Sequence, residues 1–318
     1  MIDSKIRYNI TNIYLIMSGK SRKKSKKSKQ KRKKHRHTRK FKKHACSPKK
    51  KGEALPFTCY TTQSLHKLKK IWNMRHPDQP IHSNHPRDIW KHLRYYTRNT
   101  CSSESCWLRH QCIKNDIDKS MWNDNFAPFS PKNWNTNPNE WLTTTDIQKV
   151  MGQWEKAHPN FSFIGPSPID YDNHVAFGEC VWEELCKFSL TKYLREGKNK
   201  IGVIFNLDKH TQPGSHWVAV FIDCIKKQVI YFDSYGDNIP GRINKFCEEI
   251  LKQSETFGEK YQKIISKKRH QYGNSECGMY CLFFIIQLLK GTKHATFEKN
   301  RIADSKMTKL RKQLFNPQ

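Results

Sequence analysis

Apolar residues in the second half of the chain gather in runs whose length and spacing predict a β-sheet. Three runs are nearly continuous, which is typical of strands buried on both faces: Ile201–Leu207, His216–Asp223 and Gln228–Asp233. Shorter runs at Phe161–Ile164 and Lys263–Ser266 predict two more strands, the second of them at a sheet edge. We therefore expect a mixed sheet that is covered on both sides.

One helix is predicted to lie at the centre of this domain. An uninterrupted apolar run extends from Met279 to Leu289, directly after Cys277 and Gly278. A helix that is hydrophobic all round is normally buried in the core, and Gly291 suits its C-terminal cap. We expect this helix to end near residue 290 and to carry Cys277 where a loop becomes a helix.

Amphipathic spacing predicts the remaining helices. They are one helix capped by Thr145 or Asp146, one over Cys180–Tyr193, one over Ile243–Leu251, and two nearer the N-terminus, capped by Ser64 and Asp88. Separate helices and strands in this order predict an α+β fold. We expect a main domain over residues 138–318 and a small, mostly helical N-terminal module over residues 56–137.

The formal charge of +31 is concentrated near the N-terminus. Residues 20–51 contain nineteen Lys or Arg and no Asp or Glu. Such a segment buries too little apolar surface to fold, so we expect residues 1–55 to be a disordered basic arm. The arm suits nucleic-acid binding through residues 20–51. A solubilising or nuclear-address tail is the alternative.

The apolar stretch Ile10–Met17 is too short to cross a membrane, and no small-residue cleavage site follows it. We therefore expect neither a signal peptide nor a membrane partner. Met1 and Met17 are both candidate start residues.

The eleven cysteines are odd in number and irregular in spacing. Without a secretion signal, this favours reduced thiols in a cytosolic, nuclear or virus-factory compartment. One cluster has zinc-ligand residue types: Cys101, Cys106, His110 and Cys112. It lacks the tight paired spacing of zinc sites, so we expect packed thiols there. No metal and no cofactor are predicted.

Two strands place a histidine near an acid. If they form a hairpin around residues 224–227, His216 and Asp233 are symmetric about the turn and face each other. A carboxylate in that position fixes the imidazole tautomer and stabilises the imidazolium. A register shift of a residue or two makes Asp237 or Asp223 an alternative.

Cys277, at the start of the central helix, is a candidate nucleophile. The helix dipole and a nearby imidazolium favour a thiolate, and a free backbone N–H can stabilise an oxyanion. Gln271 supplies a second donor, and Gly278 removes bulk where a substrate would approach. A structural thiol or a packed core histidine explains Cys277 or His216 alone, but not the combined spacing.

These motifs resemble the ubiquitin-like-protein protease family. The resemblance rests on His-Trp at a strand start, Tyr-Phe-Asp-Ser with its Asp seventeen residues after the His, and Gln-x5-Cys-Gly before a buried helix. Trp141–Ile147 also resembles the start of the SUMO-protease domain, with Thr143 and Thr144 in place of Asn-Asp. The family includes SUMO-deconjugating proteases, and the adenovirus and African swine fever virus endopeptidases are relatives. Residues 56–140 resemble the N-terminal extension of thiol proteases from giant DNA viruses.

The resemblance implies a papain-like or adenain-like cysteine protease fold. It assigns the base to His216, the orienting acid to Asp233, the nucleophile to Cys277 and an oxyanion donor to Gln271. Trp217, Trp141 and Gly278 are then expected to contact a thin Gly-Gly-like segment of the substrate, since aromatic walls exclude side chains. Simple core packing is the alternative for Trp217.

We therefore expect a monomeric cysteine endopeptidase that cleaves after Gly-Gly-type sequences through an acyl-enzyme intermediate. Viral structural polyproteins are the favoured substrates, in the virion, the host cytoplasm or a viral factory, and the basic arm makes the nucleus an alternative. Removal of SUMO or ubiquitin-like modifiers is the second hypothesis. A Cys-dependent acetyltransferase is disfavoured because such enzymes use Glu more often than Asp. A nucleic-acid-binding protein with an inactive protease domain is disfavoured by the complete residue set.

Overall fold

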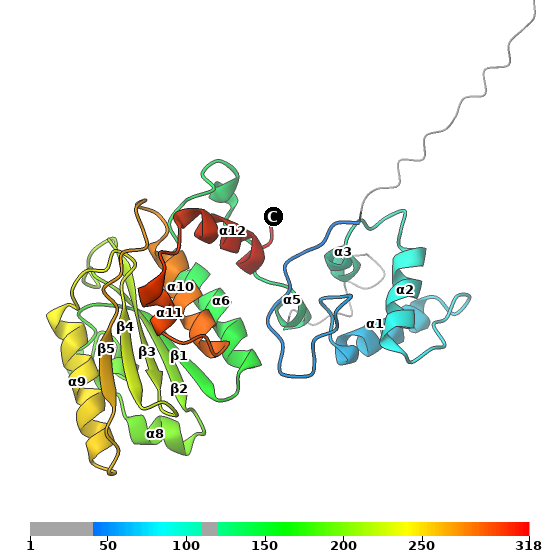
Figure 1. Ribbon diagram of the computed structural model, residues 1–318. Helices are drawn as coiled ribbons and strands as arrows, with labels where there is room; N and C mark the ends of the chain where they lie inside the picture. The colour runs from blue at the N-terminus through cyan, green and yellow to red at the C-terminus, as the bar shows by residue number, and fades with distance from the viewer. Residues whose placement is uncertain (1–40, 110–119, 318) are drawn as a thin grey trace, which may run out of the picture. The chain divides into compact units, whose positions relative to one another are not determined.

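The computed structural model describes residues 41–109 and 120–317. Residues 40–318 form one compact unit, and its C-terminal part is built on a five-stranded sheet (Figure 1). The strands lie side by side in chain order: β1 (Phe161–Pro168), β2 (Lys200–Asn206), β3 (Trp217–Asp223), β4 (Gln228–Phe232) and β5 (Gln262–Ile265). All five predicted strands are present, and β1 is longer than predicted.

The sheet is mixed and has helices on both sides, as predicted. β1 and β5 pair in parallel with their neighbours, whereas β2, β3 and β4 pair antiparallel. In β3, Trp217, Ala219 and Phe221 belong to the core on one face, and Val218 and Val220 belong to the core on the other. Since successive strand side chains point to opposite faces, a strand buried on both faces must be apolar throughout.

Helices supply these two cores (Figure 1). One face packs against α6 (Thr144–Ala157), α10 (Cys277–Leu289), α11 (Ala295–Lys299) and α12 (Asp304–Leu314); the other packs against α7 (Glu183–Cys186), α8 (Leu190–Arg195) and α9 (Gly241–Glu255).

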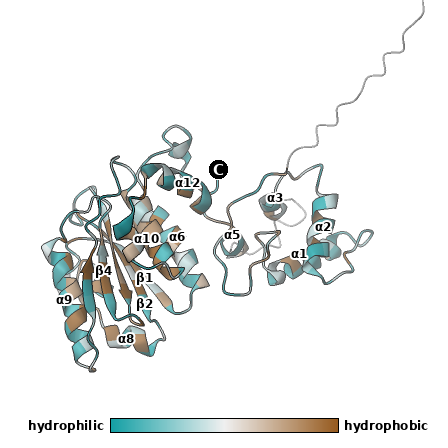
Figure 2. Cartoon of the chain, in the orientation of Figure 1, coloured by the Kyte–Doolittle hydropathy of each residue, from teal (hydrophilic) through white to brown (hydrophobic). Residues whose placement is uncertain are grey.

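The predicted central helix is α10, which contacts β3. Every residue of this helix except Gln287 is buried, and Figure 2 shows α10 among the hydrophobic segments. The helix ends as predicted, because Gly291 has a φ of 88°, the left-handed conformation of a helix C-terminus.

The N-terminal part of the unit contains short helices around a separate core. They are α1 (Thr62–Arg75), α2 (Pro86–Tyr96), α3 (Glu104–Arg109) and α5 (Ser120–Asn125), followed by the 3-10 turn η1 (Lys132–Asn135). Tyr60 and Trp107 stack at the centre of this core, with ring centroids 5.8 Å apart, and both are fully buried.

The predicted N-caps lie too far along the chain. Thr61, not Ser64, caps α1, because its side chain accepts the backbone N–H of Ser64 at 3.1 Å. Thr143, not Thr145 or Asp146, caps α6 in a reciprocal capping box with Asp146. In both helices the third residue is polar and was mistaken for the N-cap, whereas the true N-cap is the threonine three positions earlier.

The α2 cap is also different from the prediction. The N-cap residue is His85, Pro86 begins the helix, and Asp88 lies in its first turn. Proline is favoured at this first position because the missing N–H would have no helical partner.

The predicted helix over Cys180–Tyr193 is two short helices, α7 and α8. Cys180 lies outside them in an antiparallel bridge with His174. Ser189 interrupts the pattern because its hydroxyl accepts the backbone N–H of Lys192 at 3.3 Å and so starts α8. The apolar spacing alone did not reveal this internal cap.

Three disulfides correct the prediction of reduced thiols. They join Cys46 to Cys59, Cys101 to Cys106 and Cys180 to Cys186, with Cα separations of 5.0, 5.4 and 6.2 Å. Those separations suit a disulfide. The fold brings each pair of cysteines together, and the irregular spacing of the cysteines along the chain does not reveal these pairs. Cys101 and Cys106 are therefore bonded to each other rather than packed as separate thiols, while His110 and Cys112 lie outside the described residues.

Folded structure begins before the predicted boundary at Pro56. Cys46 forms a disulfide with Cys59 and an isolated antiparallel β-bridge with Phe126. Phe41 packs against Trp90 with ring centroids 6.2 Å apart. These anchors order residues 41–55 despite their lysines. The rest of the predicted arm, residues 1–40, lies outside the described residues. Within the described ranges, no helix is both long and apolar enough to cross a membrane.

Candidate active site

The start of β3 and the end of β4 bring an imidazole and a carboxylate into contact. His216 immediately precedes β3, and Asp233 immediately follows β4. Nε2 of His216 lies 2.7 Å from Oδ1 of Asp233, and the two side chains are 12% and 2% exposed. Such a short hydrogen bond to a buried carboxylate is charge-assisted when the ring is protonated.

The reason for this contact differs from the predicted one. Asp223 pairs with Gln228, so the hairpin is centred one residue later than a direct His216–Asp233 pairing requires. Continued past the strand ends, this register places Tyr235 opposite His216, and the two rings stack with centroids 4.7 Å apart. Asp233 therefore reaches the imidazole from a diagonal position.

The other two acids lie elsewhere. Asp223 accepts the backbone N–H of Lys226 at 3.0 Å within the hairpin turn. Asp237 is exposed in the loop that follows β4. Asp233 is thus the carboxylate that contacts His216.

Polar side chains hold the loop that leads to His216. Oδ1 of Asn206 accepts the backbone N–H groups of Asp208 and Ser215 at 2.9 and 3.2 Å. Asp208 in turn accepts the Ser215 hydroxyl at 2.6 Å. These bonds replace the strand ladder where β3 has not yet begun, and they fix the backbone that carries the imidazole.

Cys277 is the first residue of α10 and is 1% exposed. Its backbone N–H is one of those that the first helical turn leaves without a helical partner. The Cys277 thiol lies close enough to the His216 side chain to raise the pKa of the imidazole. Since Nε2 of that ring is engaged by Asp233, Nδ1 is the nitrogen left for the sulfur.

The surroundings of His216 favour its protonated form. Burial lowers the pKa of His216, but the hydrogen bonds and charges of Asp233 and Cys277 outweigh it and raise the pKa to about 9. At neutral pH the ring therefore carries a proton. An imidazolium beside the sulfur is the arrangement that supports a thiolate nucleophile.

Gln271 is fully buried and held in one orientation. Its Oε1 accepts the hydroxyl of Ser234 at 2.7 Å, so the nitrogen end faces the loop that leads to Cys277. There Nε2 donates to the carbonyl oxygen of Gly273 at 2.8 Å. An amide nitrogen carries two hydrogens, and the second is directed at the Tyr235 hydroxyl over a longer distance of 3.4 Å.

Tyr235 is a site residue that the sequence prediction missed. Besides stacking on His216, it donates its backbone N–H to Oδ1 of Asp233 at 2.9 Å and its hydroxyl to the carbonyl of Gly273 at 3.1 Å. It thus connects the imidazole, the acid and the loop that leads to Cys277. The correct hairpin register would have identified it, because that register places Tyr235 opposite His216.

A cleft of about 570 Å³ is lined in part by the loop that leads to His216. Gly214, two residues before His216, and Trp217, directly after it, line the cleft together with Trp141 and Leu142. Trp217 is 6% exposed and donates Nε1–H to the carbonyl of Leu142 at 3.1 Å, so this residue both packs in the core and lines the cleft. Trp141 is 37% exposed.

Gly278 makes room for a neighbouring side chain. A Cβ at this position would lie 3.1 Å from Cβ of Leu142, closer than ordinary van der Waals contact. The predicted reason for this glycine, room for a substrate, is therefore replaced by close packing. Because Leu142 also lines the cleft, Gly278 supports the cleft wall indirectly.

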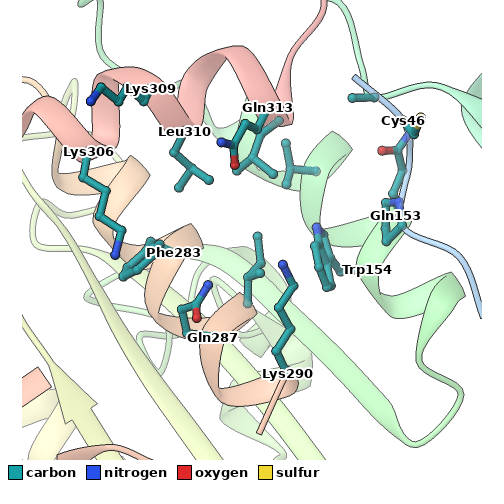
Figure 3. A pocket seen from close by; sticks show the side chains of 15 residues that line it. Cys46, Gln153, Trp154, Phe283, Gln287, Lys290, Lys306, Lys309, Leu310 and Gln313 are labelled. Carbon is teal, nitrogen blue, oxygen red and sulfur yellow. The ribbon is translucent and has the colours of Figure 1, made fainter. Parts of the chain in front are cut away.

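A second cavity, of about 430 Å³, is lined by lysine and aromatic side chains (Figure 3). It is bordered by α6, α10 and α12. The ammonium groups of Lys290 and Lys306 lie over the rings of Trp154 and Phe283, at 5.2 and 4.6 Å. Of the predicted site residues, Trp141 and Trp217 line the cleft and none lines this second cavity.

A buried ion pair anchors the start of α10. Glu276, the N-cap residue, accepts Nε–H of Arg311 from α12 at 3.1 Å, and the two side chains are 5% and 4% exposed. The same guanidinium lies 4.5 Å from the ring of Trp134. Burial raises the pKa of Glu276 against the opposing effect of Arg311. The pair joins the residue before Cys277 to the C-terminal helix.

Replacing Arg311 with Met is expected to lower the free energy of unfolding by about 3–5 kcal/mol, since it leaves a buried carboxylate without its partner. Urea denaturation followed by intrinsic fluorescence measures the change. The exposed neighbour Lys312, changed to Met, is the matched control. The double variant with Glu276→Gln should recover part of the loss, and a loss below about 1 kcal/mol in Arg311→Met would contradict this role.

Residues 138–318 match the model of the Ulp1 protease family, C-terminal catalytic domain. The chain is 32% identical over 222 residues to a protein of Acanthamoeba polyphaga mimivirus named as a thiol protease, covering 69% of this chain and 70% of that one. It is 30% identical over 232 residues to a cysteine protease of African swine fever virus, covering 68% of this chain and 83% of the viral protein.

The crystal structure of the African swine fever virus protease superimposes with a TM-score of 0.63 at 22% sequence identity, covering 86% of this chain and 96% of that one. At this identity the likeness shows a shared fold. The family match spans the range in which the thiol, imidazole and carboxylate come together. The chain therefore belongs to the Ulp1 protease family of cysteine proteases.

Proposed function

We propose that this chain is a cysteine endopeptidase that cleaves after Gly-Gly-type sequences, with Cys277 as nucleophile and His216 as its base. The observation that carries the proposal is the buried His216 imidazole, which is hydrogen-bonded to Asp233 and whose pKa is raised by the neighbouring Cys277 thiol at the start of α10. This geometry meets the requirement that a nucleophile, a base and an orienting group lie within hydrogen-bond reach of one another.

The reaction follows from these positions. The Cys277 thiolate adds to the carbonyl carbon of the scissile bond, and the oxyanion is stabilised by the free N–H of Cys277 and by the amide of Gln271. The His216 imidazolium then donates its proton to the leaving amine, and a thioester remains. A water molecule, deprotonated by His216, attacks the thioester and releases the acid product and the thiolate.

Two residues keep the imidazole in place during this cycle. Asp233 holds the Nε2–H tautomer and stabilises the cation, and the Tyr235 ring covers one face of the imidazole. Because the Tyr235 N–H also fixes Oδ1 of Asp233, the carboxylate cannot rotate away without losing two hydrogen bonds.

The cleft beside His216 supports selection of glycine at the cleavage site. Trp217 directly follows His216, Leu142 lies against Gly278, the residue after Cys277, and both are buried in the cleft wall. We expect the more exposed Trp141, which lines the same cleft, to cover the substrate chain. Rigid apolar walls reject a Cβ by steric exclusion rather than by weaker attraction. A thin Gly-Gly segment is the substrate that such walls admit.

Viral structural polyproteins are the substrate class we propose. Support comes from the viral relatives, among them the African swine fever virus protease, which matches the chain over 83% of its own length. Removal of SUMO-like modifiers is the second candidate, favoured by the name "SUMO-1 cysteine protease" given to other isolates of that viral protein. The basic residues 20–51 are proposed to bring the enzyme to nucleic acid inside the particle or factory.

Fluorogenic peptides that differ only at the last two positions before the cleavage site test this proposal. A Gly-Gly peptide should be cleaved, whereas Ala at either position should lower kcat/KM by about 10²-fold or more. Equal cleavage of the Ala peptides would contradict glycine selection. Viral core polyproteins and SUMO precursors, compared at equal concentration, then separate the two substrate classes by their kcat/KM.

A further inference from the structure

The segment between β1 and α8 brings a histidine and two cysteines together outside the active site. Nε2 of His174 is 3.9 Å from Sγ of Cys180, and Cys180 is bonded to Cys186. One potential ligand atom from each of the three residues lies within 4.8 Å of the others. Among residues 41–109 and 120–317 this is the one such group found.

The backbone positions these side chains independently of the disulfide. Hydrogen bonds of 2.8–3.0 Å hold residues 171–182 in a narrow hairpin. His174 and Cys180 face each other across it in an antiparallel bridge, and Cys186 ends the short helix α7. All three side chains therefore start from fixed places whether or not the two sulfurs are bonded.

The distances suit a zinc ion. Zinc binds Cys sulfur at about 2.3 Å and His nitrogen at about 2.0–2.1 Å with tetrahedral geometry, which puts neighbouring ligand atoms about 3.5–3.8 Å apart. The 3.9 Å between His174 and Cys180 is close to that value. The Cα atoms of Cys180 and Cys186 are 6.2 Å apart, so side-chain rotation alone can separate the two sulfurs to about 3.8 Å.

We propose that His174, Cys180 and Cys186 form a zinc site in the reduced protein. A dithiol reductant transfers two electrons and two protons to the disulfide and becomes a disulfide itself. Zinc binding then releases the two thiol protons to solvent, because the ligating form of cysteine is the thiolate. Two soft thiolates and an imidazole select zinc over magnesium or calcium.

The fourth position of this site belongs to water, because no further His, Cys, Asp or Glu of the described chain joins the group. The site departs from the sequence-based expectation of no metal. Spacing along the chain does not reveal it, since the bridge between residues 174 and 180 depends on the hairpin.

The site has a structural consequence for the cleft. Val181 and Trp182, which lie between the two cysteines in the chain, line the cleft beside Trp217. Zinc bound to Cys180 and Cys186 would hold both ends of this segment in place, as the disulfide does under oxidising conditions. An effect on substrate binding rests on the proposed function, whereas metal binding does not.

Zinc stoichiometry tests the site directly. The protein carries Cys277→Ala, so that the active-site thiol cannot contribute, and is reduced with a phosphine, mixed with a small excess of zinc, desalted and analysed for metal. The parent should retain about one zinc per chain. Cys180→Ser and Cys186→Ser should each lose it. Two control variants should keep it: Cys224→Ser, which changes a free cysteine, and Cys101→Ser, which changes a cysteine of another disulfide. Cobalt in place of zinc should show a sulfur-to-metal charge-transfer band in the parent that His174→Ala weakens.

A reduced parent that retains no zinc overturns the proposal, as does zinc retained by Cys180→Ser. Thermal melting shows whether each variant is folded, so that loss of zinc by a folded variant reports the loss of a ligand and not unfolding. A folded Cys180→Ser variant that still binds zinc is decisive against the site. In the active enzyme, Cys180→Ser should raise KM several-fold with little change in kcat. An unchanged KM would limit the zinc to a role away from the cleft, while the stoichiometry would still decide whether the site exists.

Discussion

Replacing Cys277 with Ala is expected to lower kcat/KM for peptide hydrolysis by about 10⁴-fold or more, because removal of the nucleophile leaves only binding and oxyanion stabilisation. The Cys277 thiol lies close enough to His216 to raise the pKa of that imidazole, and no other group of the proposed site can form a thioester. Initial rates with a Gly-Gly peptide, at substrate concentrations well below KM, measure the effect.

Cys281 provides the matched control for this variant. It lies one turn further along α10, is fully buried and is not in a disulfide. Burial, with the nearby charges of Cys277 and Asp233, raises the pKa of Cys281 far above its ordinary range, so this thiol stays protonated. Cys281→Ala should keep activity within a few-fold of the parent. Comparable losses in the two variants would mean that packing of α10, not the nucleophile, is being measured.

Replacing Asp233 with Ala is expected to lower kcat by about 10³-fold, because the imidazole loses both the partner that fixes its tautomer and the charge that stabilises its cation. Asp233→Asn should cost far less. The Tyr235 N–H already holds Oδ1, so an asparagine oxygen would stay directed at Nε2 and only the charge would be lost. Steady-state kinetics on both variants give the two losses.

The pH profile distinguishes this role from a general loss of stability. The pKa of His216 is about 9, raised by Asp233 and Cys277 against the effect of burial. Activity should therefore fall as pH rises through about 9, where the imidazolium loses the proton it must donate. Removing the carboxylate lowers that pKa, so the alkaline limb of Asp233→Asn should move to lower pH. Asp237→Asn, at an exposed acid of the same loop, should leave it in place; an unmoved limb in Asp233→Asn would contradict the assignment.

The sheet could be predicted from the sequence because its strands are buried on both faces. A run such as Val218–Ile222 has to be apolar throughout when both faces have helical cover. The same reasoning identified α10. Helix starts were less predictable, since the true cap Thr143 and its partner Asp146 are both good cap residues and only the hydrogen bonds distinguish them.

The candidate site was predictable in its members and less so in its geometry. His216, Asp233 and Cys277 stand out by residue type and spacing, but the hairpin register depends on which residues form the turn. Because the turn is centred one residue later than predicted, Tyr235 lies directly opposite His216, and Asp233 reaches the imidazole from a diagonal position. The disulfides and the His174 group follow from contacts between segments, and a single sequence carries no spacing rule for them.

The central claim is that Cys277 is the nucleophile that His216 activates. A peptide vinyl sulfone ending in Gly-Gly tests it most directly, because a thiolate adds to the vinyl carbon and leaves a stable thioether. Intact-mass analysis followed by peptide mapping should find one adduct per chain, on the peptide that contains Cys277. Cys281→Ala should be labelled like the parent, and His216→Ala should be labelled far more slowly. Labelling that persists in Cys277→Ala, or an adduct mapped to another cysteine, would contradict the account.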